Sequence, residues 1–267
     1  MTGRESGTVP STSHYRERNS TADKALDILG LFSEERLTVS GQEVAAALGT
    51  ARSTAYRYLQ TLVNSGFLEE NPAGGYRLGV RTLELARLAR RGYGLSDIAL
   101  PVMKELCTQL GETVLLTRRS GAAAICLERC EADHPVRISY ERGSMLPVNA
   151  GASAQVLLAW LPEEQCRDLL STERLQRFTA RTVTDPDALI DRFAQIRTDG
   201  YSVSRGELDP DILGIAAPIR ADSGDVIAAL SVAALEHRVS DRALDAAVVA
   251  VRQAADHVSD QMALVGL

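Results

Sequence analysis

The sequence predicts an α+β fold of two domains, an N-terminal winged helix-turn-helix followed by a larger α/β domain. The length of 267 residues exceeds that of a typical single domain. The first part contains short segments of helical periodicity followed by a hairpin pattern, and the rest mixes strand-like runs with helical segments. A hydrophobic fraction of 45% is sufficient for a sizeable core.

The N-terminal domain is expected to contain three helices, because apolar residues recur at helical spacing over Ala22–Phe32, Gln42–Leu48 and Ser53–Asn64. Two short strands, Phe67–Glu70 and Gly75–Leu78, flank a turn that contains proline and glycine, and they predict a β-hairpin. Short helices followed by a hairpin are typical of the winged helix-turn-helix.

A fourth helix is expected over Val80–Arg91, and Gly92 and Gly94 after it predict a hinge between the domains. The expected organisation is a disordered polar tail over residues 1–19, the winged helix-turn-helix over 20–79, a linker helix over 80–95 and the second domain over 96–267.

The second domain mixes helical and strand-like segments, which predicts a largely antiparallel sheet with helices on its flanks. The expected helices are Ser96–Leu110, Ala152–Leu161, Pro162–Leu170, Pro186–Thr198 and Asp241–Leu264. The expected strands are Thr113–Arg118, Ala123–Cys130, Val136–Tyr140, Tyr201–Arg205, Ile215–Arg220 and Val226–Ala233.

Charge is distributed unevenly along the chain. The net charge is −6, but residues 1–95 hold 12 basic and 10 acidic residues, whereas the remainder holds 17 and 25. A mildly basic domain joined to an acidic one suits a nucleic-acid-binding head on a body that does not bind nucleic acid. The apolar run Val226–Leu235 is too short to cross a bilayer and the N-terminus lacks a signal-peptide core, so we expect a cytoplasmic protein without membrane contact.

The cysteines and the motif search argue against a metal site or a catalytic site. Cys107, Cys126, Cys130 and Cys166 form no CxxC pair, so buried reduced thiols are expected, with no metal and no cofactor. The chain also lacks GxSxG, HExxH and a phosphate-binding glycine loop. The acidic segment Asp209–Asp211 is interpreted as a turn. An enzyme is therefore not expected.

The helix Ser53–Asn64 has the pattern of a DNA recognition helix. Ala55, Leu59, Leu62 and Val63 form its buried side. The other side carries arginines, which can bind guanine, and hydroxyl and amide groups that reach phosphates or base edges. The candidate DNA-binding residues are Arg52, Ser53, Thr54, Tyr56, Arg57, Gln60 and, on the hairpin, Arg77.

The alternative is that these arginines only solvate the outer face of a small helical domain. Charge alone does not separate the two interpretations. The order of the elements and the scarcity of carboxylates on this helix favour DNA binding. Arg77 fits phosphate contact and a hairpin that merely closes the domain almost equally well.

Several segments, in order along the chain, resemble the IclR family of bacterial transcription regulators. They are Ala22–Leu29, Ala51–Leu62, Gly75–Gly79, Gly111–Val114, Gly143–Pro147, Phe178–Pro186 and Ile215–Ile219. Each segment alone is weakly specific, whereas together they cover nearly the whole chain after the tail.

The resemblance implies a GAF-like effector-binding domain and a homodimer, often a homotetramer, on a palindromic operator. It also implies that a small organic effector, commonly an organic or aromatic acid, changes the regulation, and we expect repression rather than activation. The effector-binding residues implied by the resemblance are Met145, Asn149, Ala152, Ser153, Ser204, Gly214, Ser231 and Ala233.

This sequence departs from the family at the expected pocket. Gly214 stands where the family usually has a cysteine, Ser204 where it has an acidic residue, and Ala233 where it has a hydroxyl. The segment Asn149–Gln155 also differs from the usual pattern. We expect a larger or less polar effector, since small residues leave volume to fill. The alternative is a regulator that has lost effector binding.

Two further classes of function are weighed against DNA binding. An enzyme would turn over a bound acid without DNA, and a protein-binding module would be insensitive to salt, whereas DNA binding weakens steeply as salt rises. In the favoured mechanism, the helix Val80–Arg91 packs against its mate in a dimer and fixes the separation of two recognition helices. The hinge at Gly92 and Gly94 would transmit the response to the effector.

Overall fold

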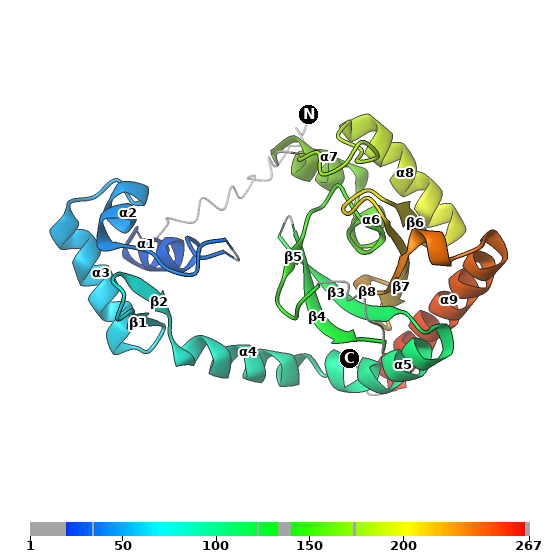
Figure 1. The fold of residues 1–267 in the computed structure, drawn as a ribbon, viewed down its shortest axis with the longest axis horizontal. Helices are drawn as coiled ribbons and strands as arrows, with labels where there is room; N and C mark the ends of the chain where they lie inside the picture. Colours follow the sequence, from blue (N-terminus) through cyan, green and yellow to red (C-terminus); the bar gives the residue numbers. More distant parts are fainter. Residues whose placement is uncertain (1–19, 34, 122, 133–139, 173–174, 265–267) are drawn as a thin grey trace, which may run out of the picture. The chain divides into compact units, whose positions relative to one another are not determined.

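The structure, a computed structural model, describes residues 20–33, 35–121, 123–132, 140–172 and 175–264 (Figure 1). The tail expected over residues 1–19, and all but the last residue of the strand expected over Val136–Tyr140, lie outside these ranges. The chain divides into two compact units between Arg87 and Leu88. Every helix in the described ranges is too short or too polar to span a membrane.

The N-terminal unit is a winged helix-turn-helix, as predicted. It contains α1 (Ser20–Leu29), α2 (Gly41–Ala47), α3 (Arg52–Asn64), β1 (Leu68–Glu70) and β2 (Tyr76–Leu78). A capping box starts α2: Ser40 Oγ accepts a hydrogen bond from Glu43 N at 3.2 Å, and Glu43 Oε2 accepts one from Ser40 N at 2.7 Å. Ile28, Leu59 and Leu68 are fully buried in the core between these elements.

The hairpin of β1 and β2, called the wing below, is fastened to the loop before α2. Val39 and Tyr76 exchange both of their backbone hydrogen bonds, at 2.9 and 2.8 Å. Asn71 Nδ2 donates to Thr38 Oγ1 at 3.2 Å. Gly75 has φ of +80°, and a Cβ there would lie 2.7 Å from the Val39 carbonyl oxygen. Only glycine permits this approach, which fixes the wing beside α2.

Two consecutive helices, α4 (Val80–Tyr93) and α5 (Leu95–Leu110), follow the wing. The helix expected to end at Arg91 continues through Gly92 to Tyr93, so of the two glycines only Gly94 interrupts the helices; the hinge itself stays a prediction. Gly94 has φ of +62°, a left-handed conformation that ends the run of helical residues at little steric cost for glycine.

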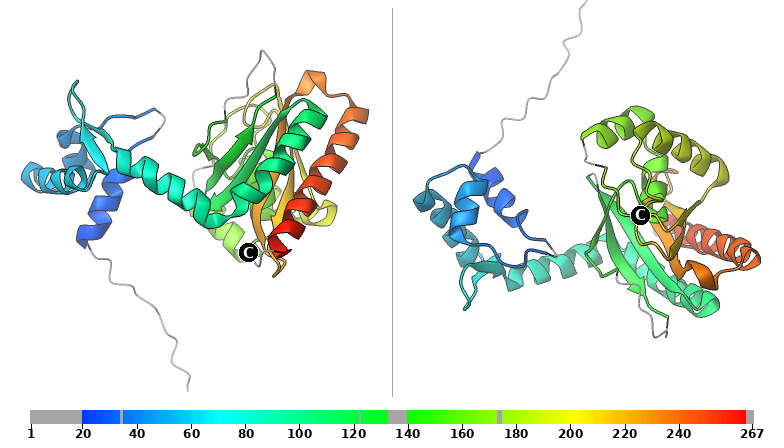
Figure 2. Two further views of the ribbon diagram at one scale, coloured as in Figure 1. Left: turned by 90° about the horizontal axis from the view of Figure 1, so that it is seen from below. Right: turned by 45° about the horizontal axis from the view of Figure 1, so that its top comes forward.

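The C-terminal unit is built around an antiparallel sheet. Within the described residues the strand order is β5 (Met145–Leu146), β4 (Ala123–Cys130), β3 (Thr113–Ser120), β8 (Val226–Leu235), β7 (Ile212–Arg220) and β6 (Ser202–Arg205). Side by side on one face lie α5 and α9 (Asp241–Leu264) (Figures 1 and 2). On the other face lies α6 (Ala152–Ala159), which packs against α8 (Pro186–Asp199), and α8 packs against α7 (Glu163–Thr172).

This arrangement confirms the predicted α/β domain with an antiparallel sheet. The strand β5 was not predicted, because two residues are too few to show the alternation that identifies a strand. The strand β7 begins at Ile212 rather than at Ile215. Its first three residues directly follow the turn Asp209–Asp211, so the sequence pattern did not distinguish them from the turn.

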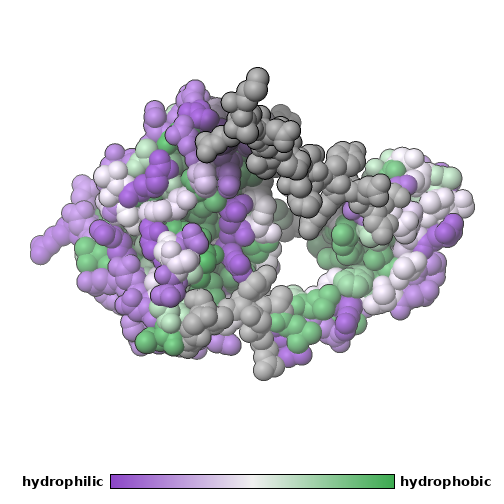
Figure 3. All heavy atoms as spheres, turned by 180° about the vertical axis from the view of Figure 1, so that it is seen from behind, coloured by the Kyte–Doolittle hydropathy of each residue, from purple (hydrophilic) through white to green (hydrophobic). Residues whose placement is uncertain are grey.

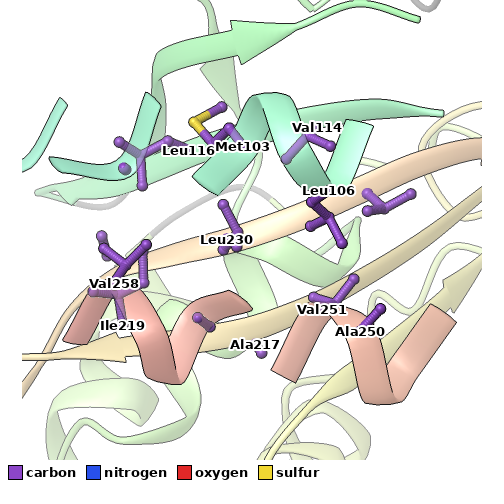
Figure 4. Close-up of a cluster of buried hydrophobic side chains, with 14 of the residues drawn as sticks. Met103, Leu106, Val114, Leu116, Ala217, Ile219, Leu230, Ala250, Val251 and Val258 are labelled. Atoms are coloured by element: carbon purple, nitrogen blue, oxygen red, sulfur yellow. The ribbon is translucent and has the colours of Figure 1, made fainter. Parts of the chain in front are cut away.

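The central strands β7 and β8 are buried on both faces. Ile215 and Ile219 of β7 belong to the core under α5 and α9, whereas Ala216 between them belongs to the core around α6. Figure 4 shows Leu106 of α5, Leu230 of β8 and Val251 of α9 gathered in the first of these cores. Large side chains therefore fill one face of the sheet, and small ones allow α6 to approach the other.

Val251 and Val249 on α9 test this assignment as a matched pair. Val251 is fully buried and Val249 is 52% exposed. Val251→Ala should lower the free energy of unfolding by about 2 kcal/mol through lost burial and a residual cavity, and Val249→Ala should change it little. Urea denaturation at one fixed protein concentration measures both. Equal losses would show that α9 does not pack as described.

Candidate functional sites

The helix α3, the candidate recognition helix, presents a polar side to solvent. Arg52, Ser53, Tyr56, Arg57 and Gln60 are exposed and Thr54 is partly exposed. Its opposite side buries Ala55, Leu59 and Leu62 in the core of the N-terminal unit, as the periodicity predicted. Among the described residues, no carboxylate forms a salt bridge with Arg52 or Arg57. Both guanidinium groups are therefore available to phosphates or base edges.

A polar hollow of about 530 Å³ lies between α3, the start of α2 and the wing. Arg52 and Tyr56 line it from α3, and Asn71 and Gly74 line it from the wing. The Tyr56 ring also packs on Gly41, where a Cβ would lie 2.8 Å from the ring carbon Cζ. Tyr56 therefore holds α2 against α3 while its side chain stays 48% exposed.

Arg77, the candidate on the wing, is already paired. Its Nη2 and Nε donate to Glu69 Oε2 across the hairpin, at 3.0 and 3.2 Å. The other carboxylate oxygen of Glu69 accepts a hydrogen bond from Val80 N at 3.3 Å. Arg77 thus helps to join the wing to the start of α4 and is less available to DNA than Arg52 or Arg57.

The C-terminal unit contains a cavity between α6 and the sheet. Ala152, Ser153, Ser204, Gly214, Ser231 and Ala233, which are six of the eight candidate effector residues, line it. The cavity has a volume of about 40 Å³. The walls are mostly apolar, with contributions from Leu115, Leu146, Leu208, Ile212 and Val232.

Hydrogen-bond donors gather at the α6 end of the cavity. Gly151 caps α6 without a side-chain hydrogen bond, and Gln155 is the first residue whose N–H reaches a helical carbonyl. The N–H groups of Ala152, Ser153 and Ala154 consequently lack helical partners. An uncapped helix N-terminus carries partial positive charge and favours an anion.

Two serine hydroxyls add to these donors. Ser153 Oγ donates to Ser231 Oγ at 2.8 Å, which leaves the Ser231 hydroxyl hydrogen without an acceptor among the described residues. Ser204 is buried at 3% exposure, lines the cavity and forms no side-chain hydrogen bond within the described chain. The Ser204 hydroxyl is not among the fully buried polar atoms without a partner, so it remains accessible to a ligand or water in the cavity.

Gly214 keeps the space in front of this helix end open. A Cβ at Gly214 would lie 3.4 Å from Ala152 Cβ, 3.6 Å from Ala152 N and 3.9 Å from Ser204 Cβ. The position that lacks the family's usual cysteine therefore adjoins both the exposed N–H groups and the unpaired hydroxyl. The added room lies where a ligand would meet the donors.

The structure does not bring Met145 and Asn149 to the cavity. The Met145 side chain is 68% exposed on the edge strand β5. Asn149 is buried, and its Nδ2 donates to the carbonyl oxygens of Gln176 and Val183, at 2.9 and 3.0 Å. Asn149 therefore fastens the segment between α7 and α8 to the chain before α6.

Two polar lining residues were not identified from the sequence. Tyr140 precedes β5, and Asp209 lies in the turn between β6 and β7. The Tyr140 hydroxyl donates to Asp209 Oδ2 at 3.0 Å. The turn interpretation of Asp209–Asp211 was compatible with the fold, but sequence offers no signal that pairs residues so far apart.

A charged network lies next to the cavity. Gln155 Nε2 donates to Glu207 Oε2 at 2.6 Å, and Ser202 Oγ donates to Gln155 Oε1 at 2.9 Å. Arg192 of α8 pairs with the other oxygen of Glu207. The buried carboxylate of Glu207 is thereby neutralised and fully hydrogen-bonded, and it anchors the turn that carries Asp209.

The cysteines have no part in either site. Cys107, Cys126 and Cys166 are buried and Cys130 is partly buried, all as free thiols. Burial raises the pKa of Cys126 to about 11. This thiol therefore stays protonated at neutral pH and packs as a small apolar side chain, as expected.

Family models match both units. Residues 21–72 match the IclR helix-turn-helix domain, and residues 89–260 match the C-terminal domain of the bacterial transcriptional regulator IclR. This chain belongs to the IclR family. The first match covers α1 to α3 and part of the wing, and the second begins within α4 and includes the cavity.

Curated IclR-family regulators are similar over most of their length. The HTH-type transcriptional regulator KipR of Bacillus subtilis is 32% identical over 245 residues, which cover 91% of this chain and 97% of KipR. The regulator BhcR of Paracoccus denitrificans is 34% identical over 243 residues, covering 90% of this chain and 86% of BhcR. Both are named as regulators of transcription.

Solved IclR structures share the fold. The crystal structure of an IclR transcriptional regulator from Silicibacter sp. TM1040 has a TM-score of 0.84 at 27% identity and covers 91% of this chain and 96% of its own. An IclR homolog from Microbacterium hydrocarbonoxydans, complexed with 4-hydroxybenzoate, has a TM-score of 0.76 at 29% identity and covers 91% and 98%.

The free and paired arginines of this IclR-family protein should differ in their effect on DNA affinity. Arg57→Ala should weaken binding to the promoter fragment of its own gene by about tenfold or more and should lower the slope of log K against log salt by about one, if it contacts one phosphate. Arg77→Ala should have a smaller effect, since Arg77 is held by Glu69. A salt series of fluorescence anisotropy measurements tests this. Equal effects of both variants would place the wing arginine in the interface.

Proposed function

We propose that this IclR-family chain is a repressor that binds a palindromic operator as a homodimer and responds to an organic monocarboxylate held in the cavity beside α6. The observation that carries the effector is the uncapped N-terminus of α6, which meets the unpaired Ser204 hydroxyl in a mostly apolar cavity. A carboxylate would accept hydrogen bonds from these groups, and an apolar body would lie against the walls.

The small size of the cavity implies that binding of an organic acid is coupled to a conformational change. A cavity volume of about 40 Å³ accommodates little more than water. An organic acid therefore requires a wider arrangement of the surrounding turns. A ligand that binds only the wider form shifts the population toward it. The relative from Microbacterium hydrocarbonoxydans, which was crystallised with 4-hydroxybenzoate, supports an organic acid as the effector class.

The alternative proposal is a regulator that has lost its effector. The small cavity favours this alternative, because residues such as Gly214 and Ala233 then serve close packing alone. The Ser204 hydroxyl argues against it, because it lines the cavity without a hydrogen-bond partner in the described chain, and a site used only for packing needs no hydroxyl there.

Ser204 and Ser202 separate the two proposals, because they lie on the same strand and differ in their partners. Ser204→Ala leaves no internal group unsatisfied, so stability should be retained while affinity for an acid falls about tenfold. Ser202→Ala removes the donor to Gln155 and should cost about 1–3 kcal/mol of stability while affinity is retained.

Calorimetry with benzoate, 4-hydroxybenzoate and hexanoate, together with thermal unfolding, measures both effects. If no acid binds the unaltered protein while its promoter fragment does, the regulator without effector is the correct proposal. If Ser202→Ala and Ser204→Ala weaken acid binding equally, the acid lies elsewhere.

The proposed dimer rests on the apolar surface of α4. Val80, Leu83, Leu85 and Leu88 are exposed on this helix, with Leu83 at 71%. Figure 3 shows hydrophobic side chains, in green, at the surface of the segment that joins the two units. A single protomer leaves these apolar side chains in water, and exposed apolar side chains gathered on one helix are typical of an interface. Packing against a second α4 would bury it and set the separation of two recognition helices.

A charge on α4 should break the dimer. Leu83→Glu places a carboxylate in the proposed interface and should shift the protein toward monomer and weaken operator binding. Val249→Glu, at a 52% exposed apolar position of α9, is the matched control and should remain dimeric. Sedimentation velocity reports the state, and an unchanged Leu83→Glu dimer would rule out this interface.

A further inference from the structure

The mouth of the cavity carries hydrogen-bond acceptors, in contrast to the donors at its α6 end. Tyr140 and Asp209 both line the cavity, and the Tyr140 hydroxyl donates to Asp209 Oδ2 at 3.0 Å. The backbone holds Tyr140 in place as well, since Arg129 Nη1 donates to its carbonyl oxygen at 2.9 Å. Asp209 is exposed, and no salt bridge with a basic side chain of the described chain neutralises it.

The hydroxyl proton of Tyr140 is already used in the hydrogen bond to Asp209. Burial, together with the neighbouring charge of Asp209, raises the pKa of Tyr140 well above its ordinary value, so the phenol stays protonated. Its hydrogen points to Asp209, and what remains toward the cavity is the lone pairs of the phenol oxygen and the second carboxylate oxygen. Both are acceptors.

The cavity lining therefore combines a group of hydrogen-bond donors, a pair of acceptors and apolar walls. The N–H groups at the start of α6, with the Ser204 and Ser231 hydroxyls, form the donor end. Leu115, Leu146 and Ile212 are among the walls. A ligand that satisfies both ends has an anionic group, an apolar body and, away from the anion, a hydrogen-bond donor.

We propose that Tyr140 and Asp209 select an effector that bears a hydroxyl or amino donor on the end opposite its carboxylate. This inference rests on the proposed function, in which the carboxylate binds at α6. A dicarboxylate is rejected, because its second charge would meet Asp209 without a counter-ion. An acid without a distal donor leaves the acceptor pair to water and gains nothing from it.

Matched series of acids test the selection near neutral pH. The aromatic series is benzoate, 4-hydroxybenzoate, 4-aminobenzoate, 4-methoxybenzoate and terephthalate. The aliphatic series is hexanoate, 6-hydroxyhexanoate, 6-aminohexanoate and adipate. In whichever series binds, calorimetry should show the donor-bearing acids binding about tenfold tighter than the unsubstituted acid, with the dicarboxylate weakest. The methoxy acid, which has the oxygen without the hydrogen, should show no gain. In the aliphatic series, comparison of 6-hydroxyhexanoate with 6-aminohexanoate distinguishes a neutral donor from a cationic one. In the aromatic series, comparison of 4-hydroxybenzoate with 4-aminobenzoate distinguishes a strong neutral donor from a weaker one.

Two charge-neutralising substitutions in the same turn locate the effect. Asp209→Asn should abolish the preference for donors and reduce the rejection of dicarboxylates. Asp211→Asn makes the same change of charge at an exposed position that does not line the cavity, and it should leave the preference intact. Tyr140→Phe should lower the preference as well. Retained affinity of each variant for promoter DNA shows that it is folded.

The outcomes separate this inference from the proposed function. If acids bind with equal affinity whether or not they carry a distal donor, the carboxylate site stands and the selection by Tyr140 and Asp209 is wrong. If both asparagine variants lose the preference equally, the effect is one of long-range charge and the contact is again wrong. If no acid binds in either series while DNA binding persists, both the effector proposal and the selection fail.

Discussion

The complete burial of α6 is the constraint on which the C-terminal unit depends. All eight residues of this helix, Ala152–Ala159, are buried, so its backbone cannot use bulk water to satisfy its first turn. Close approach to the sheet is possible because β7 and β8 present small residues, such as Gly214, Ala216 and Ala229, on this face. A helix end placed inside the protein without a side-chain cap makes a donor-rich pocket wherever the packing leaves space.

The same burial explains why the charge of the Glu207 carboxylate, next to the cavity, is neutralised by neighbouring side chains. Gln155, in the first turns of α6, donates to Glu207, and Arg192 supplies the counter-charge. A buried carboxylate without such partners would cost several kcal/mol. Thr182 also donates to the Glu207 carbonyl oxygen at 2.6 Å, which joins the segment before α8 to the same turn. Asp209 is therefore displayed at the mouth by a turn whose base is firmly held.

Local patterns predicted the elements better than they predicted the sites. The apolar stripes of α3 and α9 and the continuous apolar runs of β3 and β8 lie within one segment each, so the sequence pattern identifies them. Six of the eight residues implied by the family resemblance line the cavity, because the scaffold fixes which residues face α6. It failed for Met145 and Asn149, whose positions depend on a short edge strand and on a tie to residues 176 and 183.

Interactions between distant segments account for the remaining differences. The pairing of Arg77 with Glu69 depends on the register of the wing, and that of Tyr140 with Asp209 joins segments 69 residues apart. Neither pair can be identified from the sequence, because several other residues of suitable charge or hydrogen-bonding capacity are equally plausible partners. Gly92 was expected to break α4, but an isolated glycine costs only about 1 kcal/mol in a helix, and its neighbours carry the helix through it.

A response to the effector follows from the conflict between the donors and the available space. The α6 end offers more hydrogen-bond donors than the surrounding protein satisfies, yet the cavity admits little more than water. Under the proposed function, an acid would gain the energy of those donors only in a form with a wider mouth. Its affinity would then differ between the two forms, which is the thermodynamic requirement for a ligand to shift an equilibrium. Leu208 and Asp209, which line the cavity, belong to the turn between β6 and β7 and lie outside the strands of the sheet. The sheet and α6 can then stay fixed while the turn moves, so binding need not be offset by any loss of core packing.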